Sequence, residues 1–142
     1  MKKLKCMSFQ QNLNKIKPKQ LFLIDGLGAF VSAFLLGIIL VNFESFFGMP
    51  REVLYPLAII PCVFAVYSFF CFFRIPEKWR SFLKIIAIAN LLYCCLTMSL
   101  VIYFYSELTV LGLLYFVLEL AIILFLVFIE LKMASNPVGL NV

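Results

Sequence analysis

Four long runs of apolar residues occupy most of this chain, and they restrict the possible fold more than any other feature. They cover residues 21–41, 53–73, 82–104 and 109–131. A helix needs about 20 predominantly apolar residues to cross a hydrocarbon core about 30 Å thick. Apolar residues form 65% of the chain and charged residues 13%, whereas a soluble domain has about 45–50% and about 25%. The sequence therefore predicts an integral membrane protein of the all-α class, folded as a four-helix transmembrane bundle.

The apolar runs leave no room for a soluble domain beside them. We expect a basic cytoplasmic N-terminal tail at residues 1–20, a single membrane domain at 21–132 and a cytoplasmic C-terminal tail at 133–142. The first run is too long for the apolar part of a signal peptide, and no small-x-small cleavage site follows it. It is therefore expected to be a retained span. The loop at 42–52 contains a Gly-Met-Pro turn and is expected either to connect two spans or to dip back as a lid.

Basic residues gather at alternate ends of the apolar runs. Residues 1–20 hold six lysines, the loop at 74–81 holds two arginines and a lysine, and Lys132 follows the fourth run. The loops at 42–52 and 105–108 carry glutamates instead. Because lysine and arginine favour the cytoplasmic side of a membrane, we expect an up-down bundle in a cell inner membrane with both termini cytoplasmic. The basic tail is also suited to contact with anionic lipid.

The polar residues of the chain exclude several classes of enzyme and cofactor protein. The chain has no histidine, which rules out histidine-ligated haem and most zinc or copper sites. None of the five cysteines forms a Cys-x-x-Cys pair, as a four-helix disulfide-generating oxidoreductase would need. No loop combines a nucleophile, a base and an orienting group. We therefore expect no enzyme activity, no catalytic residue, no metal or cofactor and no nucleic-acid partner.

One acidic residue lies almost at the middle of the fourth run. Glu119 would cost about 2.5–3.5 kcal/mol at that depth on insertion-based scales. A carboxyl group there can stay protonated and donate a hydrogen bond, because burial disfavours its charged form. Tyr115 lies one turn away on the same helical face, and the third run carries a polar stripe at matching depth. The candidate intramembrane polar site consists of Glu119, Tyr115, Asn90, Tyr93, Thr97 and Ser32.

This polar site has two interpretations. Hydrogen bonds between helices can simply hold a bundle together, at about 0.6 kcal/mol each in measured cases. Membrane carboxylates also mark proton and cation pathways, which would make Glu119 the centre of a small transporter or channel. The first interpretation predicts a non-enzymatic accessory or structural protein that packs with itself or with a membrane-protein partner. The second predicts a proton- or cation-linked transporter.

Two further groups of residues are expected to shape the bundle. Small residues spaced three or four apart on the first run form a helix-packing face that lets backbones approach closely in lipid. This face comprises Gly26, Ala29, Ala33 and Gly37. Asp25, Lys84 and Glu130 each lie near the cytoplasmic end of a span, and Lys84 is expected to bridge the two carboxylates or to extend to water. Asp25 is also expected in the first turn of its helix, where an acid suits the helix dipole.

Three stretches of the chain resemble small four-span bacterial membrane proteins without an assigned function. They are Leu-Ile-Asp-Gly-Leu-Gly-Ala-Phe at 23–30, Glu-Ser-Phe-Phe-Gly-Met-Pro-Arg at 44–51 and Ile-Ala-Ile-Ala-Asn-Leu-Leu-Tyr-Cys-Cys-Leu at 86–96. The resemblance covers most of the chain and implies the four-span fold, but no activity. The chain is also loosely similar to small multidrug transporters, which have four short helices and an essential membrane glutamate. Their glutamate is in the first helix, whereas Glu119 is in the fourth.

Overall fold

Every secondary-structure element that the structure describes is helical. The computed structural model describes residues 1–13, 16–74 and 77–135. Four helices in this part of the chain are long and apolar enough to cross a membrane, which confirms the predicted all-α class and the four spans. In chain order the elements are α1 Lys2–Leu13, α2 Pro18–Phe34, the π-helix η1 Leu35–Leu40, α3 Glu44–Phe47, α4 Arg51–Phe73, α5 Trp79–Tyr103 and α6 Val110–Ser135.

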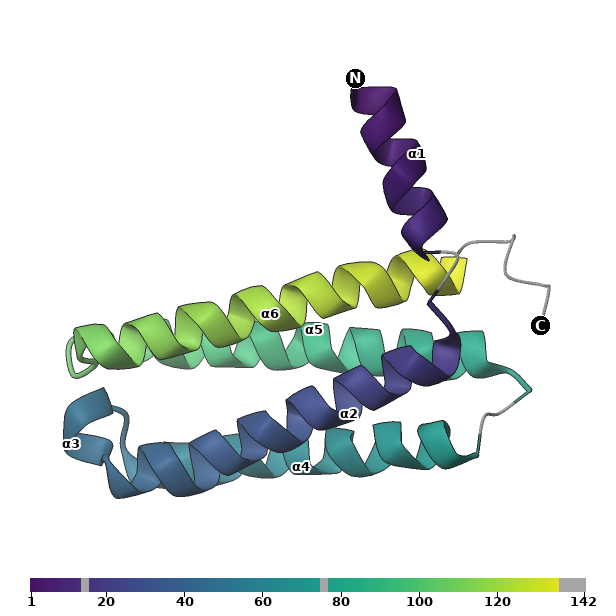
Figure 1. Cartoon of the computed structure of the whole chain (residues 1–142). Coiled ribbons are helices and arrows are strands. Elements are labelled where there is room, and N and C mark those ends of the chain that lie inside the picture. The colour runs from purple at the N-terminus through teal and green to yellow at the C-terminus, as the bar shows by residue number, and fades with distance from the viewer. Residues whose placement is uncertain (14–15, 75–76, 136–142) are drawn as a thin grey trace.

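The apolar runs located the spanning helices to within a few residues at each end. The first span starts three residues before the predicted position, at Pro18, because proline is well tolerated at a helix start, where its missing N–H has no partner to lose. The last span continues to Ser135, and residues 136–142 of the expected C-terminal tail lie outside the described residues. The expected N-terminal tail contains α1, which projects away from the bundle (Figure 1).

The four spans are arranged as two closely packed helix pairs. Helix α2 packs along α4, and α5 packs along α6, while far fewer contacts join one pair to the other. Figure 1 shows α3 and the α5–α6 turn at one end of the bundle, and α1 with the end of α6 at the other. We call these the α3 end and the α1 end.

Small residues explain why α2 and η1 approach α4 closely. A Cβ atom added at Gly26 would lie 3.3 Å from the Phe69 ring, and one added at Gly37 would lie 3.4 Å from the Ala58 Cβ. Ala33, on the same face, is buried. Gly26 and Gly37 of the predicted helix-packing face therefore meet α4 of the same chain. The fourth member, Ala29, is only partly buried and lines a cavity that is described below.

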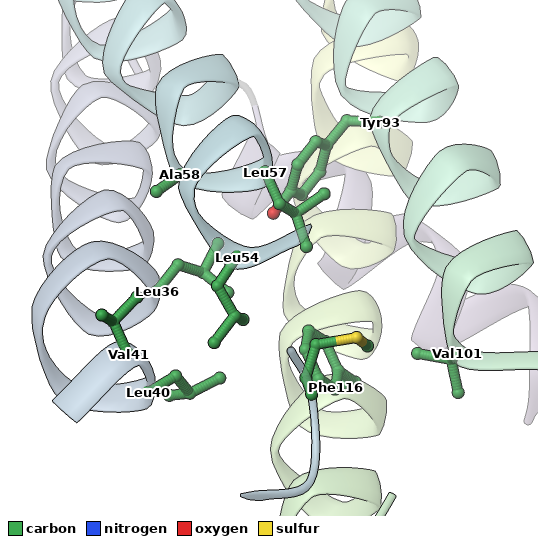
Figure 2. Close-up of a cluster of buried hydrophobic side chains, with 10 residues drawn as sticks. Leu36, Leu40, Val41, Leu54, Leu57, Ala58, Tyr93, Val101 and Phe116 are labelled. Carbon is green, nitrogen blue, oxygen red and sulfur yellow. The ribbon is translucent and has the colours of Figure 1, made fainter. Parts of the chain in front are cut away.

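An apolar cluster fills each end of the bundle. At the α1 end, Leu21, Phe22, Cys71, Leu83, Ile86 and Ala134 pack together. The larger cluster at the α3 end draws on all four spans and comprises Leu36, Leu40, Val41, Met49, Leu54, Leu57, Ala58, Tyr93, Val101 and Phe116. Figure 2 shows Leu57 of α4 and Tyr93 of α5 pointing toward one another across the two helix pairs. Both clusters contain residues from both helix pairs, so their burial holds the pairs together.

The α3 end is also fastened by backbone contacts. The Thr109 N–H donates a hydrogen bond to the Phe47 carbonyl oxygen at 3.2 Å, and the Thr109 hydroxyl donates one to the Phe46 carbonyl oxygen at 2.5 Å. A Cβ atom at Gly112 would overlap the Phe47 carbonyl oxygen. Gly48 ends α3 with φ at 82°, a conformation that side chains disfavour. The loop at 42–52 is thus held against the start of α6 in this structure.

Candidate intramembrane polar site

Glu119 lies at the junction of three spanning helices. It is only 7% exposed, and its Oε1 atom accepts hydrogen bonds from the Ser32 hydroxyl at 2.9 Å and the Tyr93 hydroxyl at 3.3 Å. Ser32 belongs to α2, Tyr93 to α5 and Glu119 to α6. The carboxyl group therefore joins the two helix pairs. Its second oxygen, Oε2, is buried and has no hydrogen-bond partner.

Tyr115 is the nearest polar neighbour of Glu119 along α6. The two residues are one turn apart and share a helical face. The Tyr115 ring packs edge-on against Phe47 of α3, with ring centroids 6.2 Å apart. Its hydroxyl group is buried and has no hydrogen-bond partner. Two buried polar atoms on this face of α6 therefore have no partners, the Glu119 Oε2 atom and the Tyr115 hydroxyl.

A second polar layer surrounds Asp25. This residue is 3% exposed, and each of its carboxyl oxygens accepts one hydrogen bond. The Ser68 hydroxyl donates to Oδ2 at 2.5 Å, and the Asn90 amide donates to Oδ1 at 2.8 Å. Glu130, which is 0% exposed, interacts with both Asp25 and Asn90. One residue from each of the four spans therefore contributes to this layer.

The spacing of residues along the helices explains why there are two layers. Glu119 and Glu130 are separated by three helical turns, or about 16 Å, and lie on nearly the same face of α6. Asp25 and Ser32 are two turns apart on one face of α2. Both faces point into the bundle, so α2 and α6 each supply one residue to the Glu119 layer and one to the Asp25 layer.

The structure brings together only part of the site expected from the sequence. Ser32 and Tyr93 bond to Glu119, but Asn90 bonds to Asp25 instead. Thr97 is buried, and its hydroxyl has no hydrogen-bond partner. Asn90 and Tyr93 share a stripe on α5, but they differ in depth by about 4.5 Å and so serve different layers. Asn90 and Tyr93 therefore belong to different layers although they lie on the same face of α5.

Asp25 and Glu130 of the expected ion cluster lie together, and Lys84 lies apart from them. The side chain of Lys84 is exposed, and the ion pair found in the described ranges joins Arg51 to Glu44 at the α3 end. Of the two arrangements expected for Lys84, the exposed side chain agrees with extension to water and not with a bridge between the carboxyl groups. One expectation for Asp25 is wrong. Asp25 is the eighth residue of a helix that begins at Pro18, so it lies beyond the first turn and does not cap the dipole.

Ser68 was missed by the sequence analysis, although it is the closest partner of Asp25. It is fully buried on α4. The sequence pattern that could have indicated it is weak, because Ser68 is a single serine in a stretch of aromatic and aliphatic residues. A serine in a spanning helix commonly bonds to its own backbone, so sequence alone does not assign it a partner on another helix.

A cavity of about 440 Å³ lies between the helix pairs and connects the two layers. Its polar lining comprises Asp25, Ser32, Asn90, Tyr93, Tyr115 and Glu119, and the lining described here includes no lysine or arginine. Its walls are apolar. Leu27 and Val31 of α2 and Leu118 and Ile122 of α6 line the cavity and are also exposed on the surface of the bundle. The cavity therefore opens sideways between α2 and α6.

Within the described residues, no group of three or more histidine, cysteine, aspartate or glutamate residues is arranged to hold a metal ion. The polar groups that line the cavity are carboxyl, hydroxyl and amide groups. No protein-family model, curated protein or solved structure matches this chain.

Proposed function

We propose that this protein is a small, non-enzymatic transporter that binds lipophilic ammonium ions in the cavity between α2 and α6. The observation that carries the proposal is the unpartnered Oε2 atom of the buried Glu119 at the wall of that cavity. A buried acceptor without a donor is costly. A ligand that brings both a positive charge and a hydrogen-bond donor would remove that cost.

The size and lining of the cavity support this class of ligand. Its volume of about 440 Å³ falls within the range of about 300–1,000 Å³ typical of small-molecule sites. The apolar walls suit an alkyl or aryl group, and the acidic side chains of Asp25 and Glu119 suit a cation. The Tyr115 ring and its free hydroxyl lie at the same wall, where an aromatic face can also attract an ammonium group.

The sideways opening supports entry from the bilayer. Lipid covers the exposed apolar faces of α2 and α6 in a membrane, so the mouth of the cavity would face acyl chains and not water. A lipophilic cation partitions to this region, with its apolar part in the hydrocarbon. We therefore propose that the ligand approaches laterally between the two helix pairs and turns its ammonium group toward Glu119.

The transport assay for this proposal uses purified protein in liposomes. Phenylbutylamine, which is protonated at neutral pH, is a suitable probe because its ammonium group brings both a positive charge and N–H donors for the Glu119 Oε2 atom, and protein-free liposomes measure its passive leakage. We expect protein-dependent uptake, and we expect Glu119→Gln to fold but to lose at least about 90% of it, a change of about 1.4 kcal/mol or more. Glu44→Gln, which changes an acid at the α3 end, is the matched control. Uptake that is equal in wild type and Glu119→Gln would exclude Glu119 as the cation site.

A structural or accessory role is the second candidate, and one observation favours it. The hydrogen bonds of Glu119 and of Asp25 each join the α2–α4 pair to the α5–α6 pair. Such bonds can serve only to hold the bundle. In that case Glu119→Gln retains both fold and function, and the protein copurifies with a stoichiometric membrane partner or a second copy of itself.

We also propose an up-down topology in the inner membrane, with both termini and the α4–α5 connection in the cytoplasm. The distribution of lysine and arginine supports it, and the lysines of α1 would then lie near anionic headgroups. The test is labelling of intact cells with a membrane-impermeant maleimide, in a chain whose native cysteines are replaced by alanine. Glu107→Cys should be labelled and Glu77→Cys should not. The reverse pattern would invert the topology.

A further inference from the structure

Glu130 is the most deeply buried charged-type side chain in the bundle and is not needed by the proposed ammonium site. It is 0% exposed, and neither of its carboxyl oxygens accepts a hydrogen bond. An ionised carboxylate without donors or a cation is strongly disfavoured in an apolar interior. Glu130 must therefore either pair with a cation or remain protonated.

The neighbouring polar groups are distributed unequally between the two acids of this layer. Asp25 receives one donor on each oxygen, from Ser68 and Asn90. Two donors on two oxygens stabilise a carboxylate. Glu130 interacts with Asp25 and Asn90, but neither of its oxygens has a partner in hydrogen-bond geometry. The geometry therefore marks Asp25 as the acceptor of the pair and leaves Glu130 as the group that must supply a proton.

The ion pair that the described residues show joins Arg51 to Glu44 at the α3 end, away from Asp25 and Glu130. Near the α1 end, Lys84 of α5 is exposed, and Arg80 lies 5.3 Å from the Trp79 ring centre. The ammonium group of Lys19 lies 4.9 Å from the Phe72 ring centre. These contacts direct the cationic groups toward aromatic rings near the ends of the helices.

The remaining titratable groups on the adjoining helices are also directed elsewhere. On α4, the Tyr67 hydroxyl donates to the Phe82 carbonyl oxygen at 3.1 Å, and Cys71 packs in the apolar cluster of the α1 end. On α6, Glu119 is three turns away. The Asp25–Glu130 pair is thus an acidic site that shares Asp25 with the cavity lining and lies away from the ion pair described at the α3 end.

We propose that Asp25 and Glu130 form a proton-binding site in which Glu130 holds one proton and donates it to the Asp25 carboxylate. Binding converts two facing carboxylates and one proton into a hydrogen-bonded acid–carboxylate pair, with no other reactant. Release returns the proton to water and leaves two negative charges that repel across α2 and α6. Asp25 lies seven residues after the start of α2 and Glu130 five residues before the end of α6, so the water at the α1 end is the nearest to the site. This site does not depend on ammonium transport.

Infrared difference spectroscopy of the protein in bilayers tests the proton directly. Wild type and Glu119→Gln should both show the C=O stretch of a protonated carboxylic acid at neutral pH. A double variant, Glu119→Gln with Glu130→Gln, should lose that band completely. The Glu119→Gln spectrum decides the matter even if the double variant fails to fold, because the other four acids that would remain lie in loops or at helix ends. Absence of the band from Glu119→Gln would overturn the proposal.

Thermal unfolding as a function of pH supplies a second readout. The folded protein would keep the Glu130 proton at pH values where the unfolded chain has lost it, so folding binds a proton and stability must fall as pH rises. The melting temperature of Glu119→Gln should therefore fall between neutral and alkaline buffer, and that of the double variant should not. Equal slopes would contradict the site. A melting temperature that rises with Na⁺ but not with choline at constant ionic strength would instead assign it to a metal cation.

Discussion

The two ends of the bundle are closed by different kinds of contact. At the α3 end, Thr109 and Gly112 bring the start of α6 against the backbone of α3. At the α1 end, an apolar cluster is backed by a layer in which Asp25 joins α4 and α5 through side-chain hydrogen bonds. Where backbone atoms touch and leave no room for a Cβ atom, the two helices can shift little relative to one another. Hydrogen bonds between side chains depend on protonation and can be exchanged for bonds to water or ligand.

This difference implies that the α3 end is the fixed part of the bundle and the α1 end the adjustable part. The cavity lies between them and contacts the adjustable layer through Asp25 and Asn90. A change in the Asp25 layer can therefore reach the cavity without disturbing the α3 end. Substitutions at the two ends should differ accordingly in size and in pH dependence.

The largest effect is expected from Gly112→Ala at the α3 end. The added Cβ would overlap the Phe47 carbonyl oxygen, and the cost of forcing atoms into a packed site is about 3 kcal/mol. Thermal unfolding in detergent, followed by circular dichroism, should show a large loss of melting temperature at every pH. Gly28→Ala is the matched control, because its Cβ would meet only the Leu126 side chain at 4.0 Å. Equal melting temperatures for the two variants would show that the α3 end is not fixed.

A smaller, pH-dependent effect is expected from Ser68→Ala at the α1 end. The change removes one of the two donors to Asp25, and a hydrogen bond to a charged group contributes about 1.5 kcal/mol. The loss should be measured by the same unfolding assay and should change with pH, unlike the loss from Gly112→Ala. Ser99→Ala is the control, because the Ser99 hydroxyl bonds only to the Cys95 carbonyl oxygen of its own helix. A Ser68→Ala variant as stable as this control would remove the distinction between the two ends.

The spans were predictable from sequence because apolar length alone determines which segments can cross a membrane. Their polar contacts were only partly predictable. Glu119 was identified from its depth, and Ser32 and Tyr93 from matching depth, but the partner of Asn90 depends on the depth and rotation of α5 relative to α2. The outward direction of Lys84 depends on the same rotation, which no local pattern records.

The contacts at the α3 end could not be predicted from the sequence for a different reason. Gly112 is one glycine in an apolar run, and nothing near it in the sequence indicates that the Phe47 backbone will approach it. The helix α1 was also unexpected, because its lysine-rich sequence has no apolar stripe of the kind that identifies an amphipathic helix. In both cases the missing information is a contact or a conformation that depends on distant parts of the chain.

The central claim is that the cavity binds a cation through Glu119, and ligand binding tests it most directly. Calorimetric titration of the protein in lipid nanodiscs should compare phenylbutylamine, phenylbutanol and phenylbutanoate, which share one apolar part and differ in charge. We expect the amine to bind at least about tenfold more tightly than the alcohol, a difference of about 1.4 kcal/mol, and the carboxylate not to bind. Glu119→Gln should abolish the preference for the amine while the protein remains folded. Equal affinity for the amine and the alcohol, or an amine preference that survives in Glu119→Gln, would contradict the account.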